Sequence, residues 1–127
     1  MSIPNDLFYT ENHEWVSVDG NEGVIGITDH AQDELGDIVF VELPSVEEEI
    51  GQFEEFGVIE SVKAVSDVFM PVSGTVVEVN EELMDAPETV NDDPYGSGWL
   101  IKVELNDKSE LDELMDSTEY EAFLEEE

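Results

Sequence analysis

The sequence predicts a mainly β fold, a small sandwich of short strands with a few short helices and two amphipathic helices at the C-terminal end. Three observations support this fold class. Short apolar runs alternate with turn residues over most of the 127 positions. Residues 36–42 resemble residues 74–80, and two similar β units that flank a hairpin indicate a quasi-symmetric sandwich. The tail changes to helical spacing of its apolar residues.

The strands and first helices follow from local patterns. Residues 19–21, Asp-Gly-Asn, suit a hairpin turn between the first two strands. Thr28 can cap a short helix that ends at Gly36, and Pro87 suits the first turn of another helix at about 88–91. The strands themselves are expected at residues 14–18, 23–27, 38–43, 57–62, 67–70, 75–79 and 99–104.

The tail predicts two short amphipathic helices within residues 109–125. Ser109 and Ser117 can cap them, and the apolar residues behind each serine are spaced i, i+3, i+4: Leu111, Leu114 and Met115, then Tyr120, Phe123 and Leu124. Their apolar faces are expected to cover one side of the sandwich. We therefore predict a single domain over residues 1–127, with its core at roughly 14–105.

The charge of the chain is extreme: 35 acidic residues against three lysines and no arginine give a formal net charge of −32. Such charge opposes a compact state at low ionic strength. Near 1 M salt the Debye length falls to about 3 Å and most of the repulsion disappears. Because the acids are spread along the chain rather than gathered in a tail, the charge predicts a protein from the cytoplasm of a salt-adapted organism.

The same composition excludes several classes of function. Nucleic acids and anionic membranes need clustered Lys and Arg, which this chain lacks. No apolar run approaches the ~20 residues of a membrane span, and the first residues do not resemble a signal peptide. Without cysteine there are no disulfides or thiolate sites. A cytoplasmic monomer is expected.

Lys63 is the only lysine or arginine in the first 101 residues. The octet 60–67, Glu-Ser-Val-Lys-Ala-Val-Ser-Asp, is nearly a mirror image about its centre, and mirrored residues become cross-strand partners in a hairpin. We therefore expect Lys63 at a tight turn with its amine in water, accessible to a modifying enzyme. The expected cross-strand pairs are Val62 with Val65, Ser61 with Ser66 and Glu60 with Asp67.

Signals of catalysis are absent from the sequence. There is no Gly-rich phosphate loop, no dinucleotide-binding fingerprint and no nucleophile elbow. His13 and His30 are the only histidines, and neither has a metal-binding spacing. We expect neither a catalytic site nor a metal site in this chain, although residues 13–15, His-Glu-Trp, can line a pocket.

Residues 57–67 resemble the lipoylation hairpin of the H protein of the glycine cleavage system. The resemblance continues, in order, at residues 9–16, 26–32, 36–44, 71–80 and 91–99 and in the closing pair of helices. It implies a barrel-sandwich hybrid related to lipoyl and biotinyl domains. It also implies that lipoic acid is attached covalently to Lys63, on a hairpin whose neighbouring residues are Glu60, Ser61, Val62 and Ala64.

The resemblance further implies a carrier without catalytic activity of its own. Such carriers take the aminomethyl group of glycine from a pyridoxal-phosphate decarboxylase to a tetrahydrofolate-dependent aminomethyltransferase. A flavin-dependent dihydrolipoyl dehydrogenase reoxidises the arm, and a lipoate-attaching enzyme installs it. Glu14 and Asp67 match positions that line a cleft for the loaded arm. Asn12 stands where relatives often have a small hydroxyl residue.

Several alternatives remain open at this stage. Biotinyl domains usually carry methionines beside the lysine, where this chain has Val62 and Ala64. Lipoyl domains of 2-oxo-acid dehydrogenases are usually shorter and lack the block at 13–15. A relay protein that supplies lipoyl or octanoyl groups to other complexes is a further possibility. An acidic interaction module with an unmodified Lys63 is the alternative outside the carrier class.

Overall fold

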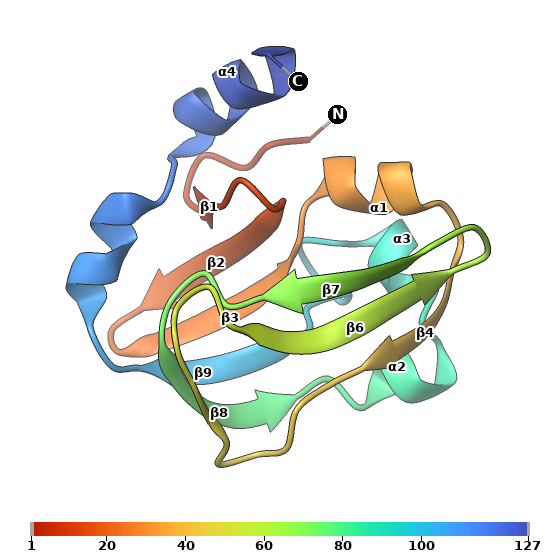
Figure 1. Cartoon of the computed structure of the whole chain (residues 1–127), viewed down its shortest axis with the longest axis horizontal. Helices are drawn as coiled ribbons and strands as arrows, with labels where there is room; N and C mark the ends of the chain where they lie inside the picture. Colours follow the sequence, from red (N-terminus) through yellow and green to blue (C-terminus); the bar gives the residue numbers. More distant parts are fainter. Residues whose placement is uncertain (1, 127) are drawn as a thin grey trace.

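The computed structural model describes residues 2–126 and consists of two antiparallel sheets that pack face to face, with helices at their margins (Figure 1). The larger sheet has six strands in the order β1 (Phe8–Tyr9), β2 (Glu14–Asp19), β3 (Glu22–Ile27), β9 (Ile101–Leu105), β8 (Gly74–Val79) and β5 (Glu49–Ile50). The smaller sheet has three strands in the order β4 (Ile38–Glu42), β6 (Glu55–Ser61) and β7 (Val65–Phe69).

The predicted β sandwich is confirmed, and each expected strand is present with its ends shifted by at most two residues. The two segments that resemble each other form β4 and β8, one in each sheet. Strands β1 and β5 were not predicted. Each has only two residues, too few to show alternation, and each forms by pairing with a longer neighbour, β1 with β2 and β5 with β8.

Helix α1 (Asp29–Leu35) begins and ends as predicted. The Thr28 hydroxyl accepts a hydrogen bond from the Ala31 amide at 3.2 Å, and Gly36 ends the helix with a φ of 78°, in the left-handed region that favours glycine. Helix α3 (Thr89–Asp92) confirms the helix expected behind Pro87. The single turn α2 (Glu82–Asp85) was not predicted.

The tail forms two helices as predicted but departs from the prediction in the type of the first helix and in the caps of both. The segment η1 (Lys108–Glu113) is a 3-10 helix, and the carboxylate of Asp107, rather than Ser109, caps it by accepting from the Ser109 amide at 3.0 Å. Leu111 lies in this helix, and Leu114 follows it directly in extended conformation. Both contact the main core. The last helix, α4 (Ser117–Glu126), forms as expected, but Asp116 rather than Ser117 caps it: the Asp116 carboxylate accepts from the Glu119 amide at 2.8 Å.

Two apolar clusters hold the molecule together. The main core lies between the sheets and contains residues from both, such as Ile25, Ile59 and Val103. A second cluster joins β1, β2 and α4 through stacked rings of Tyr9 and Tyr120, whose centroids are 4.6 Å apart. The tail thus covers one side of the sandwich, as predicted. None of the helices within residues 2–126 has the length and apolar composition needed to span a lipid bilayer.

Candidate functional site

Lys63 lies at the tip of the hairpin that joins β6 to β7 (Figure 1). The turn is held by Ser61: its amide donates to the Ala64 carbonyl at 2.8 Å, and its hydroxyl accepts from the amides of Lys63 at 3.3 Å and Ala64 at 3.1 Å. The Val62 amide donates to the Asp37 carbonyl at 3.0 Å, which ties the tip to the segment between α1 and β4. The lysine therefore projects from a turn that backbone contacts hold on both sides.

The register of this hairpin differs from the predicted one. Instead of the three expected pairs, Glu60 faces Val65, Ile59 faces Ser66 and Val58 faces Asp67. The centre of the hairpin therefore lies between Val62 and Lys63, one residue earlier than the mirror symmetry predicts. The physical reason is the Ser61 side chain, which binds amides across the turn and so sets Ser61 opposite Ala64. Lys63 is at the tip in either register.

The Lys63 side chain is exposed, and its stem lies over Gly36 at the end of α1. A Cβ at position 36 would lie 3.3 Å from Cε of the lysine, so any other residue there would push the flexible lysine stem slightly aside. Within residues 2–126, no carboxylate forms an ion pair with the Lys63 ammonium. Lys102 is different, because it pairs with Glu78 at 3.6 Å and lies over the ring of Trp99. The amine of Lys63 is thus accessible to another molecule.

Glu14 is fully buried, with an exposed fraction of 1%. One carboxylate oxygen accepts from the Thr10 hydroxyl at 2.5 Å, and the other accepts from the Phe69 amide at 3.1 Å. Strand β7 is the edge of its sheet, so this carboxylate satisfies an amide that has no neighbouring strand. Burial raises the pKa of Glu14 to about 7, although both hydrogen bonds act to lower it. Glu14 thereby connects β2 in the large sheet to β7 in the small one.

The other two residues expected in the arm cleft are exposed, whereas Glu14 is buried. Asp67 is exposed on β7, two residues before Phe69. Asn12 is exposed between β1 and β2, where its amide donates to the Thr10 hydroxyl at 3.2 Å. Asn12 lines a cavity of about 380 Å³ that neither Glu14 nor Asp67 lines. Thr10, which contacts both Asn12 and Glu14, was missed by the sequence reasoning because a lone threonine carries no signal.

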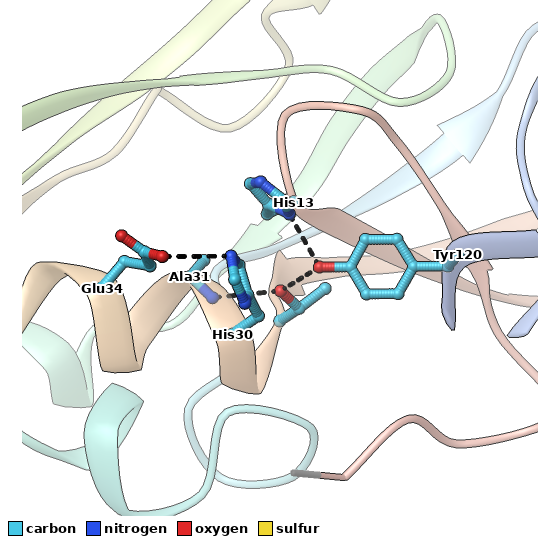
Figure 2. Close-up of polar contacts among 6 residues, drawn as sticks. His13, His30, Ala31, Glu34 and Tyr120 are labelled. Carbon is cyan, nitrogen blue, oxygen red and sulfur yellow. Dashed lines mark hydrogen bonds and ion pairs between the residues drawn. The ribbon is translucent and has the colours of Figure 1, made fainter. Parts of the chain in front are cut away.

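A second cavity, of about 600 Å³, is lined by His13, His30, Glu34 and Leu124. Figure 2 shows how α4 contributes to this region: the Tyr120 hydroxyl hydrogen-bonds Nδ1 of His13 at 2.8 Å. The same hydroxyl contacts Thr28 Oγ1 at 2.8 Å. The two imidazole rings lie 4.6 Å apart, and His30 Nε2 is 3.4 Å from the Glu34 carboxylate. His13 does line a cavity, whereas the sequence placed Tyr120 only on the apolar face of a tail helix and did not predict its contact with His13.

Comparison with known proteins identifies the family to which the chain belongs. The model of the family described as "Glycine cleavage H-protein" matches residues 7–127. The chain belongs to the glycine cleavage H-protein family. A glycine cleavage system H protein of Halothermothrix orenii is 60% identical over 126 residues, covering 99% of this chain and 98% of the relative. The mitochondrial H protein 2 of Arabidopsis thaliana is 59% identical over 125 residues, covering 98% of this chain and 80% of the relative.

A solved structure confirms the fold of the family. The crystal structure of a glycine cleavage system H protein from Mycobacterium marinum superposes with a TM-score of 0.86 at 41% sequence identity, covering 94% of this chain and 97% of that one. The chain therefore has the barrel-sandwich hybrid fold related to lipoyl domains, as the resemblance implied. As a member of this family, it has the carrier role in glycine cleavage.

Proposed function

We propose that Lys63 carries lipoic acid in an amide bond and that the chain works as a lipoyl carrier through this one residue. The observation that supports this most strongly is the amine itself, which is exposed at a hairpin tip and has no ion pair within residues 2–126. A lysine amine loses its charge on becoming an amide, so its modification leaves no ammonium that needs a partner. Lys63 and the turn that holds it therefore suit the covalent attachment of a lipoyl group.

The lipoyl group, once attached, supplies a dithiol that carries the aminomethyl group derived from glycine. The chain's own residues position the attachment point. Ser61 and the Asp37 carbonyl hold the turn, and Gly36 leaves room for the lysine stem. Tethering to such a fixed point raises the effective concentration of the arm at each partner enzyme.

The proposal extends to a resting place for the loaded arm near Glu14, Asp67 and Asn12. The amine of the carried group is cationic near neutral pH, and nearby carboxylates attract it. Glu14 is buried, so it acts on the arm only through its charge and by holding the edge of β7, where its carboxylate binds an amide two residues from Asp67. Asn12 is linked to Glu14 only through Thr10, so its contribution is expected to be the weakest of the three.

The remaining features follow from the carrier role and the composition. We infer that the chain acts as one carrier domain without catalysis of its own. Its partners are glycine decarboxylase, the aminomethyltransferase, dihydrolipoyl dehydrogenase and a lipoate-attaching enzyme. The net charge of −32 supports a monomer that works in the cytoplasm of a salt-adapted organism, where high salt screens the repulsion among its acids.

Mass spectrometry tests the proposal directly. Protein purified from its native cells should carry one lipoyl increment, located on Lys63 by peptide mapping. The variant Lys63→Arg should fold normally, lack the increment and fail to support glycine decarboxylation in a reconstituted system. The matched variant Lys102→Arg should retain both. A chain without the increment, or an active Lys63→Arg variant, would overturn the proposed function.

A further inference from the structure

The three-stranded sheet turns one face to the core and the other to solvent. The core face carries Val41, Ile59 and Val68. The register of β4, β6 and β7 places the alternate residues opposite one another on the solvent face. These residues form two rows of three side chains, which we call the outer face: Phe40–Glu60–Val65 and Glu42–Val58–Asp67.

The outer face is a checkerboard of apolar and acidic side chains. In the first row an acid lies between two apolar residues, and in the second an apolar residue lies between two acids. Phe40 is 47% exposed and Val65 is 67% exposed, and Val62 at the hairpin tip is 68% exposed. None of the labelled helices crosses in front of β6 and β7 in Figure 1. In a chain whose surface is dominated by carboxylates, apolar groups gathered at this exposure indicate a contact surface.

The position of the outer face ties it to Lys63. Two residues of its first row flank the lysine: Val65 lies two residues after Lys63 on β7, and Glu60 lies three residues before it on β6. Val39, which is 52% exposed, lies in the bulge of β4 beside Phe40. The Asp37 carbonyl, just before β4, accepts a hydrogen bond from the Val62 amide at the hairpin tip. Any protein that encloses the Lys63 amine must therefore lie close to these apolar groups.

Resting on the proposed function, we propose that the outer face is the docking surface for the enzyme that attaches the acyl group to Lys63. That enzyme presents a complementary surface, with apolar side chains opposite Phe40, Val58 and Val65 and with lysine and arginine opposite the acids Glu42, Glu60 and Asp67. It is favoured over the other partners because it must bring its active site to the lysine nitrogen itself. The partners that act on the finished arm work at the arm's far end and have no need to cover the tip.

The attachment step is a nucleophilic acyl transfer. Nζ of Lys63, as the free amine, attacks the carbonyl carbon of an acyl adenylate held by the enzyme. The amide C–N bond forms, the bond between the acyl carbon and the AMP oxygen breaks, and the proton of the amine leaves to solvent. No oxidant or reductant is required, so the outer face has only to align the amine with the acyl carbon.

Acylation kinetics test the docking surface. Full-length unmodified protein, ATP, lipoic acid and a lipoate-attaching enzyme are mixed, and the acylated fraction is followed by intact mass. The double variant Phe40→Ser/Val65→Ser should lower kcat/KM for acylation about tenfold, mainly through KM, as expected for the loss of two exposed apolar contacts. The control Val46→Ser/Val77→Ser removes two exposed apolar residues that line a cavity bordering β8 instead, and should stay within about twofold of the wild type.

Two further measurements separate docking from folding and from the carrier role. Val65→Thr keeps the β-branched shape and replaces a methyl by a hydroxyl, and should lower kcat/KM without changing the thermal midpoint. Once fully acylated, this variant should support glycine decarboxylation at the wild-type rate. If acylation of Val65→Thr and of the serine variant matches that of the control, the docking proposal is wrong while the carrier function stands. If Lys63 of the wild type accepts no acyl group, the docking proposal and the proposed carrier function are both wrong.

Discussion

Glutamine in place of Glu14 would keep the size of the side chain and an acceptor oxygen but would remove its ionisation. Burial raises the pKa of Glu14 from 4.5 to about 7 in the folded protein, and unfolding returns the carboxyl to water. The protonated form is therefore favoured by folding. Its contribution to stability is fully present below pH 4.5 and is lost as the pH rises through about 7. Glutamine is uncharged at every pH, so the stability of the Glu14→Gln variant lacks this pH dependence.

The size of the effect follows from the two pKa values. Each tenfold difference in proton affinity between the folded and unfolded states is worth about 1.4 kcal/mol. Between pH 5 and pH 8, the free energy of unfolding of the wild type should therefore fall by roughly 2.5 kcal/mol relative to that of Glu14→Gln. The other carboxylates and both histidines are common to the two proteins, so their titration cancels in this difference.

Urea unfolding at several pH values, followed by tryptophan fluorescence at constant high salt, measures this difference. Glu11→Gln is the matched control, because Glu11 is exposed in the same turn region and its substitution should leave the pH dependence as in the wild type. Parallel curves for the wild type and Glu14→Gln would refute the reasoning. They would mean that the carboxyl ionises in the folded protein as it does in water, despite its burial.

Three other predictions concern stability. Asn91→Ala should lower the free energy of unfolding by roughly 2 kcal/mol, because its side chain donates to the Gly36 carbonyl at 2.8 Å and accepts from a β4 amide, whereas exposed Asn106→Ala should have little effect. Gly57→Ala should cost about 1–3 kcal/mol in urea unfolding, since the new Cβ would lie 2.5 Å from the Glu42 carbonyl oxygen. Transfer from about 1 M to about 0.01 M KCl should lower the thermal midpoint, because the Debye length grows from about 3 to about 30 Å. An unchanged midpoint would argue against salt adaptation.

The local elements and the position of Lys63 were predictable because their signals lie within a few residues of one another. Thr28 and Gly36 bound α1 through contacts inside that helix and its first turn. The hairpin around Lys63 was expected from eight consecutive residues, and either register leaves the lysine at the tip. The register itself was predicted wrongly, because mirror symmetry in composition says nothing about which amides the Ser61 hydroxyl binds.

The sequence by itself determined the seven longer strands, the exposed lysine at a turn and the acidic surface, since alternation, turn chemistry and charge act over short distances or over the whole composition. Only the tertiary structure decided that Glu14 is buried, because its partner on β7 is 55 residues away. The contact of Tyr120 with His13 spans 107 residues and likewise depends on how α4 packs. Such pairs form when the folded sheets and helices bring distant segments together, and no local pattern records which side chains will then meet.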